Sequence, residues 1–185
     1  NGSRAFTEDH PEIMSKLHAL FNQDNGTGRI TSMSGQGFKN AETFMNRWLA
    51  AVPKNMTDSI RKQFPGSPSG GGSDNASFVA AGAPGFSLGA LNWSYFNYTW
   101  HTNRDTYDKI VFDDLRNNAI LTAMLVYMAC EDATFFPRDK ADLNAGGASA
   151  GGGGGGRGNG GTARGPVTWP IPVKAIRKGP VAPTN

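Results

Sequence analysis

One histidine and a few carboxylates, each beside a polar or glycine-rich stretch, are the residues of this chain that could do chemistry. His101 stands in YTWHTNRDTYDKI, residues 98–110, Asp24 ends MSKLHALFNQD, residues 14–24, and Asp74 lies in GSDNASF. Imidazole and carboxylate groups are ligands that zinc takes in proteins. Read locally, Asp24 is more often a turn-capping aspartate and a lone His101 an ordinary polar histidine, so metal ligation is one of two open interpretations.

The elements around Asp24 decide whether it can face a ligand. We expect residues 14–24 to form a buried strand that ends at Asp24, and NGTG, residues 25–28, is a strong turn signal. RITSMS, residues 29–34, is predicted to be a return strand, giving a hairpin or two neighbouring strands. Ligands of open α/β sheets bind in the crevice at strand ends, so Asp24 is a fair candidate for a metal ligand.

Helices and buried strands alternate along residues 1–143, which indicates an α/β layered fold. Apolar residues recur at helical spacing from Asn40, a candidate N-cap, to Val52, so we expect an amphipathic helix whose stripe packs in the core. Residues 112–132 form the longest predicted helix. Because it is apolar nearly all round, it should pack between other elements, with Cys130 as a buried free thiol. We also predict a loop at 64–75, a short helix at 77–82 and a buried strand at 83–91.

The remaining residues differ in composition and charge. Residues 1–144 carry 15 acidic and 13 basic residues, whereas residues 145–185 carry five basic and no acidic ones. Residues 144–165 are rich in glycine and are predicted to be a flexible linker, and residues 166–185 an extended, proline-rich basic arm that docks onto another surface. Five dispersed charges with one aromatic are a weak signal for nucleic acid, and no apolar stretch is long enough to span a membrane. The arm residues that we expect to act in assembly are Trp169, Arg157, Arg164, Lys174, Arg177 and Lys178.

Taken in order, these motifs make residues 1–140 resemble the C-terminal half of the di-zinc exopeptidases of metallopeptidase family 28, which includes secreted bacterial aminopeptidases and the carboxypeptidase Q type. HTNRDTYDK is similar to the family's His-Thr-x-x-Asp-Thr-x-Asp signature, and GSDNASFVAAGAPG to its Ser-Asp-x-x-x-Phe…Gly-x-Pro segment. NQD at a strand end is similar to the position of a carboxylate ligand. The resemblance implies a partial three-layer α/β sandwich, with a mixed sheet and flanking helices, followed by the arm.

The resemblance also implies roles for single residues. Asp24 would be the terminal carboxylate on one zinc, and His101 the terminal imidazole on the other. In the complete family site, two zinc ions share a bridging carboxylate and a water, whose pKa they lower. Asn75 stands where the family often has histidine, which puts a site role for that position in doubt. The residues that would support the ligand loops from behind are Asp74, Thr102, Asp105, Thr106 and Asp108.

The family's other site residues, a His-x-Asp pair and an adjacent Glu-Glu, are not found in this sequence. Since Glu-Glu supplies the general base, we expect the chain to be inactive by itself, to hold no zinc alone and to have no catalytic residue of its own. Two hypotheses follow. The chain is either part of a secreted exopeptidase that is completed by a preceding segment, or a peptidase-derived subunit that assembles with copies of itself into an oligomer or filament. A peptide would be the substrate only of the complete enzyme, and the resemblance implies an extracellular location.

Overall fold

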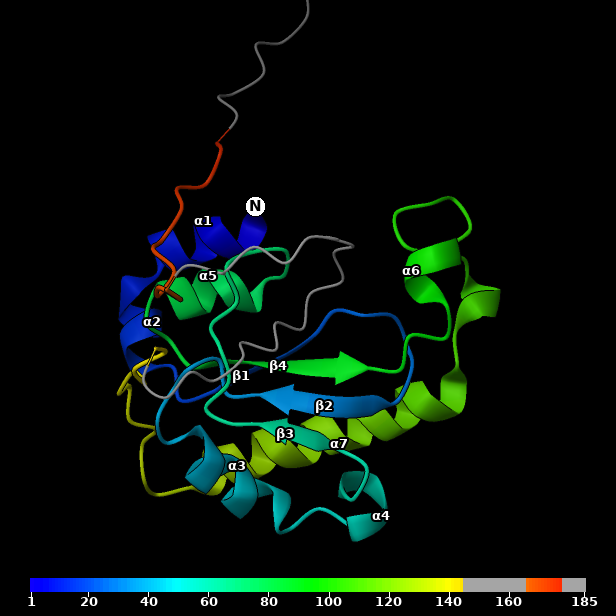
Figure 1. Ribbon diagram of the computed structural model, residues 1–185, viewed down its shortest axis with the longest axis horizontal. Helices are drawn as coiled ribbons and strands as arrows, with labels where there is room; N and C mark the ends of the chain where they lie inside the picture. The colour runs from blue at the N-terminus through cyan, green and yellow to red at the C-terminus, as the bar shows by residue number, and fades with distance from the viewer. Residues whose placement is uncertain (145–165, 178–185) are drawn as a thin grey trace, which may run out of the picture.

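Four strands form the central sheet, namely β1 (Leu20–Gln23), β2 (Ile30–Ser34), β3 (Arg61–Gln63) and β4 (Gly85–Ala90). The computed structural model describes residues 1–144 and 166–177. The strand order is β1-β4-β2-β3 (Figure 1). β1 is parallel to β4, with Leu20 opposite Gly85, and β2 is antiparallel to β4 and parallel to β3. The sheet is therefore mixed, as predicted.

Two predictions about the first strands are wrong. Residues 14–16 belong to a helix, α2 (Pro11–Lys16), and the strand that follows has only four residues. Proline in the first turn with Glu12 beside it favours a helix start there. β1 and β2 also form neither a hairpin nor neighbouring strands, because β4 lies between them. The turn after Asp24 therefore reverses the chain without pairing the two strands that it joins.

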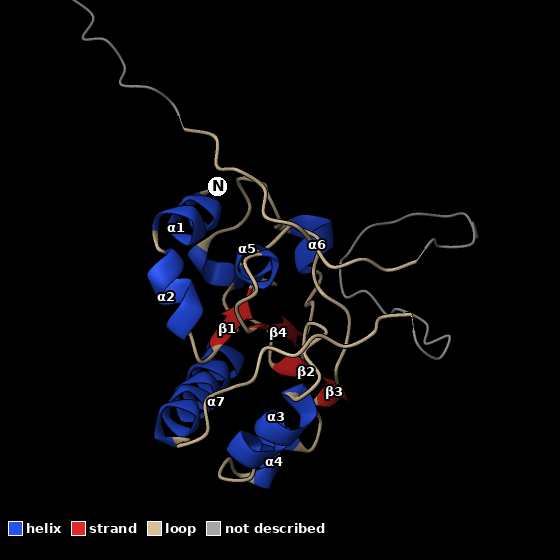
Figure 2. Ribbon diagram, turned by 90° about the vertical axis from the view of Figure 1, so that its left-hand side faces the viewer, coloured by secondary structure: helices blue, strands red, loops and turns tan. Residues whose placement is uncertain are grey.

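Helices cover both faces of the sheet, which makes three layers (Figure 2). One face carries α1 (Gly2–Asp9), α2 and α5 (Asn75–Ala80), and the other carries α3 (Ala41–Leu49), α4 (Lys54–Thr57) and α7 (Phe112–Glu131). The larger apolar core joins the sheet to α3 and α7, and a smaller one lies beneath α2 and α5. The predicted three-layer α/β sandwich with flanking helices is confirmed.

The amphipathic helix expected from Asn40 is α3. Its buried side chains have the predicted spacing, and Trp48 at their centre is fully buried. The Trp48 indole donates to Asp132 Oδ2 at 3.0 Å, beyond the end of α7, so the two helices of this layer are joined by a hydrogen bond. The stripe consists of Ala41, Phe44, Met45, Trp48 and Leu49, with Val52 just after the helix.

The longest helix, α7, departs from the prediction that it packs between other elements. One stripe of α7 is buried and contains Leu121 and Leu125, whereas Ile120, Val126 and Tyr127 on its outer side are exposed. Cys130 is exposed as well, which corrects the expectation of a buried thiol. A sequence that is apolar all round does not show which of its faces are covered within one chain.

The C-terminal arm returns to the body of the chain. Residues 166–177 have no regular secondary structure and reach α1 (Figures 1 and 2). Arg157, Arg164 and Lys178 of the predicted arm and linker lie outside the described residues. In the part of the chain that is described, no helix is long and apolar enough to cross a membrane.

Candidate functional site

Asp24 and the loop that contains His101 both follow strands at the same end of the sheet, where the carboxyl ends of β1 and β4 lie. β1 and β4 run parallel, so Asp24, directly after β1, and residues 92–111, after β4, both follow the carboxyl end of a strand (Figure 1). A cleft between the turn 25–28 and this loop is lined by Gly26, Thr27, Tyr95 and Asp105, among others. The structure thus brings the two predicted ligand segments to neighbouring positions at the edge where α/β sheets bind ligands.

Asp24 also borders a polar pocket between α1, the glycine-rich loop and the arm, which we call the Asp24 pocket. Its lining comprises Asn1, Ser3, Arg4, Thr7, Glu8, Asp24, Gly70–Asp74, Ala76, Ser77, Ala80 and Pro170–Val173. Asp24 and Asp74 are both exposed, and both residues line this pocket. Asp74 immediately precedes α5, but its side chain makes no capping hydrogen bond. Its predicted supporting role stays a prediction.

The glycine-rich loop is held by a buried glutamine that the sequence reading missed. Gln36 has a positive φ of 54° and donates through Nε2 to Ser34 Oγ at 3.1 Å and Ser87 Oγ at 3.0 Å. Its Oε1 accepts from the Ser69 N–H at 2.7 Å. Asn22 of β1 donates to Ser73 Oγ at 2.6 Å. These bonds tie residues 69–73, and hence one wall of the Asp24 pocket, to the sheet.

His101 lies in a turn that its own neighbours stabilise. It has a φ of 57°, is exposed, and stacks on Trp100 with ring centroids 4.2 Å apart. Thr102 Oγ1 donates to the Thr99 carbonyl at 2.8 Å, and Thr106 Oγ1 donates to Asp108 Oδ1 at 2.6 Å. Hydrogen bonds from Lys109 and Thr106 lower the pKa of Asp108. Thr102, Thr106 and Asp108 therefore shape the loop through local bonds, and a contact of theirs with a metal ligand stays a prediction.

Polar residues on α7 fix both segments from below. Asp114 accepts from the Trp93 indole at 2.9 Å and from Arg29 Nε at 3.3 Å. Burial raises the pKa of Asp114, but the hydrogen bonds from Trp93 and Arg29 and the arginine charge outweigh it, so the pKa is lowered. Asn118 is buried and bonds the Gly28 carbonyl at 2.7 Å and the Ile30 N–H at 2.9 Å. The turn after Asp24 and the start of the His101 loop thus share one support.

Tyr95 lies between the two segments and was also missed. Its ring packs on Gly26, where an added Cβ would come within 3.1 Å of the ring. Burial and the nearby charges of Asp105 and Asp24 raise the pKa of Tyr95. The sequence signal was the aromatic run YFNYTW before His101, but spacing alone could not select which of its rings packs on Gly26.

The described residues do not fit zinc by themselves. Within 1–144 and 166–177, no three His, Cys, Asp or Glu side chains are grouped so that they could hold a metal ion. One ligand on each of two ions is too few, since structural and catalytic zinc sites use three or four protein ligands. Zinc ligation by Asp24 and His101 therefore stays a prediction.

A three-layer sandwich with a mixed sheet defines an α/β domain, and sequence comparison gives the family. The model of peptidase family M28 matches residues 1–126, so the chain belongs to peptidase family M28. The predicted resemblance is confirmed.

One solved structure with the same fold is the crystal structure of a peptidase M28 precursor from Shewanella amazonensis SB2B, with a TM-score of 0.61 and 22% identity. The match covers 74% of this chain and 29% of that protein, so the chain spans less than a third of its length. No curated protein matches the chain.

Proposed function

We propose that this chain is one part of a zinc-dependent exopeptidase domain, in which Asp24 and His101 each supply one metal ligand. A preceding segment supplies the other ligands and the general base. The observation that carries the proposal is the shared edge: Asp24 and the His101 loop both follow carboxyl ends of the parallel strands β1 and β4. Membership of family M28 supports peptide-bond hydrolysis as the reaction, and secretion is part of the same proposal.

Close contacts between the turn after Asp24 and the two ends of the His101 loop also support the proposal. Gly28 and Leu91 cross so closely that a Cβ on Gly28 would collide with the Leu91 carbonyl. The Val111 N–H donates to Thr27 Oγ1 at 2.9 Å, which ties the end of the His101 loop to the turn after Asp24. The His101 loop is thus fixed at both of its ends. A loop held in this way can keep a ligand residue in position, which a free surface turn cannot do.

The test uses a polypeptide in which a segment with His-x-Asp and Glu-Glu precedes this chain. Asp24→Ala and His101→Ala should each reduce bound zinc and lower aminopeptidase turnover by more than about 100-fold, since even residues behind the ligands cost 10–100-fold. Zinc is counted by mass spectrometry of the dialysed protein. Turnover is followed with chromogenic aminoacyl substrates.

Asp58→Ala and His10→Ala are the matched controls, because both residues are surface residues outside the Asp24 pocket and the neighbouring cleft. They should leave zinc content and turnover unchanged. If the double variant of Asp24 and His101 retains zinc and activity, the proposal is wrong.

A second candidate, self-assembly, is favoured by one surface. Phe21 of β1 and Val126, Ala129 and Cys130 of α7 line a common hollow with Phe135. In the described residues, β1 pairs only with β4, so its other edge is free to accept a strand. Either a preceding segment of the same polypeptide or a second copy would cover this surface. The exposed thiol of Cys130 reports which of the two does so.

A further inference from the structure

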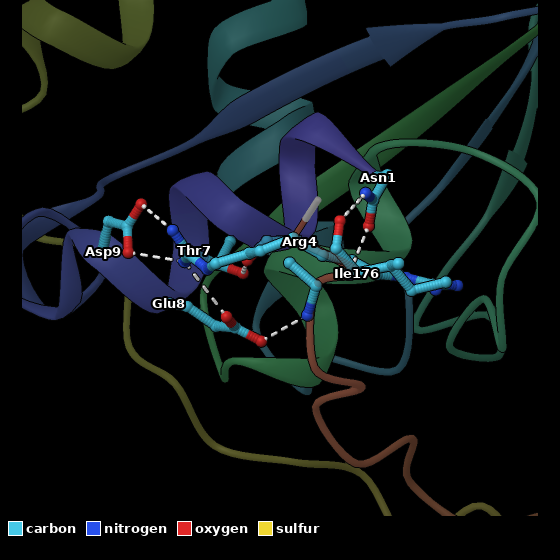
Figure 3. A network of polar contacts seen from close by, with 8 residues as sticks. Asn1, Arg4, Thr7, Glu8, Asp9 and Ile176 are labelled. Carbon is cyan, nitrogen blue, oxygen red and sulfur yellow. Dashed lines mark hydrogen bonds and ion pairs between the residues drawn. The ribbon is translucent and has the colours of Figure 1, made fainter. Parts of the chain in front are cut away.

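The arm between residues 166 and 177 contacts its own chain at two separate places. Near its start, Trp169 sits on the segments around Gly37 and Lys140. Near its end, residues 175–177 bind the beginning and end of α1 (Figure 3). Pro170–Val173 lie between these contacts and form one wall of the Asp24 pocket.

The first contact is a shaped seat for an indole ring. Trp169 meets Phe38 edge to face with centroids 5.5 Å apart, and Lys140 Nζ lies 4.7 Å above the ring. The indole N–H donates to the Ala141 carbonyl at 3.4 Å. Gly37 lies against the ring, and a Cβ there would come within 2.9 Å of it. The contacts with Phe38 and Gly37 are apolar, so salt leaves most of this contact intact.

The second contact is polar and exposed. Arg177 pairs with Asp9 at 2.7 Å and with Glu8 at 3.2 Å, and its hydrogen bond lowers the pKa of Asp9 (Figure 3). The Ala175 N–H donates to Glu8 Oε1 at 2.6 Å. Ile176 exchanges two hydrogen bonds with the side chain of Asn1, at 2.7 and 3.0 Å.

Backbone groups of the arm therefore recognise side chains of α1. Ion pairs of this exposed kind weaken as salt shortens the Debye length from about 10 Å at 0.1 M to about 3 Å at 1 M.

We propose that residues 166–177 form an intramolecular strap that covers the Asp24 pocket. The contact of Trp169, which we call the pivot, stays in place. The contacts of residues 175–177 with Asn1 and α1, which we call the latch, open as the salt concentration rises. The segment between pivot and latch carries Ile171 and Val173, which are 79% and 57% exposed. When the latch opens, this wall swings away and the Asp24 pocket widens. Control of peptide entry would follow only if the proposed function also holds, whereas the strap itself does not depend on it.

Amide hydrogen exchange followed by NMR on the full chain separates latch from pivot. The N–H groups of Ala175 and Ile176 report the latch. The Val167 N–H, which donates to Asn144 Oδ1 at 2.9 Å, reports the pivot side. Raising NaCl from 0.05 to 1 M should speed exchange at the latch about two- to five-fold, as expected for weak surface pairs, and leave Val167 unchanged. Equal change at both places, or none at either, overturns the proposal.

Variants that remove the charges of Glu8 and Asp9 test the latch at low salt by the same measurement of amide exchange. The double variant Glu8→Gln, Asp9→Asn should raise latch exchange to its high-salt rate and abolish the salt dependence. Glu12→Gln is the matched control, because Glu12 is a neighbouring exposed carboxylate that pairs with His10 and not with the arm. A double variant that keeps the wild-type exchange rates and salt dependence contradicts the latch.

A neutral soluble gadolinium chelate tests whether the strap narrows the pocket. Opening the latch should increase relaxation of the amide protons of Ser73 and Ala76, which line the pocket, and leave that of Thr102 unchanged. Unchanged relaxation at Ser73 and Ala76 would show that the arm does not cover the pocket. A concentration-dependent dimer whose arms cross between copies, detected by light scattering with mixed isotope-labelled chains, would overturn the intramolecular assignment. None of these readouts requires zinc or activity, so they fail independently of the proposed peptidase function.

Discussion

Replacing Asn118 by leucine tests the support that α7 gives to the edge of the sheet. Asn118 is 2% exposed, and its amide bonds two main-chain groups, the Gly28 carbonyl and the Ile30 N–H. The register of β2 against β4 shifts between Ile30 and Ser32, and the Ile30 N–H next to this shift is paired by Asn118. Leucine has nearly the same size but can bond neither group.

The expected cost follows from the two groups left unpaired. A buried polar group without a partner costs about 1–3 kcal/mol, so two cost about 2–6 kcal/mol. Burying leucine in place of an amide returns about 1.5–3 kcal/mol at most. Taking the middle of each range, about 4 and about 2 kcal/mol, the free energy of unfolding should fall by about 2 kcal/mol, and by about 4 kcal/mol at most. That is a substantial part of the roughly 5–15 kcal/mol that a domain of this kind has.

Asn117, one position earlier, is the matched control with the opposite expectation. Its Nδ2 is buried and has no hydrogen-bond partner among the residues that the structure describes. Asn117→Leu removes an unpaired amide and raises helix propensity, so the free energy of unfolding should stay within about 1 kcal/mol of wild type or rise. Urea denaturation followed by circular dichroism gives both values, with the m-value as a check on the unfolded state. Equal destabilisation by the two substitutions would refute the reasoning from hydrogen-bond partners.

Two further predictions concern Asp132 and Cys130. Burial raises the pKa of Asp132, but donors from Thr134 and Trp48 and the charge of Arg47 lower it below its usual value. A carboxyl whose pKa is lowered by folding stabilises the protein at pH values above its ordinary pKa, which is about 4. This stability is lost as the pH falls through the lowered pKa. The urea midpoint should therefore drop as the pH falls over this range, and it should drop less in Asp132→Asn. The exposed Cys130 thiol should react with a maleimide in the dilute chain. Labelling that slows with chain concentration indicates self-assembly, and protection that appears only in the longer polypeptide indicates a covering segment.

Much of the fold could be predicted because its signals are local. The stripe of α3 repeats at helical spacing around Trp48, and the short helix before Gly82 ends where glycine takes a φ of 79°. β4 lies within its predicted range of 83–91. The insertion of β4 between β1 and β2 could not be predicted, because strand pairing depends on contacts between residues far apart in sequence. Periodicity likewise did not show that the outer side of α7, with Tyr127, is uncovered.

The candidate site divides in the same way. The place of Asp24 at a strand end was predictable, because a turn signal follows it directly, and the structure confirms that a strand ends at Gln23. Gln36, Tyr95 and Asn118 were not predictable, since each acts on backbone or rings from another segment. Nothing in their local sequence distinguishes them from other polar or aromatic residues. The seat of Trp169 depends on Gly37 in the same long-range way.

The two sides of α7 bear on the proposal that the chain is completed by a partner segment. Its inner polar residues, Asp114 and Asn118, hold the turn after Asp24 and the start of the loop that contains His101. Its outer apolar side continues through Val126 to Phe21 on β1, whose other edge is unpaired among the residues that the structure describes. A segment that pairs with β1 in parallel would place the carboxyl end of its strand beside Asp24. Under the proposed function, one and the same segment would cover the apolar side and complete the ligand set. A second copy packed on α7 satisfies only the first need, which favours the completed exopeptidase over self-assembly.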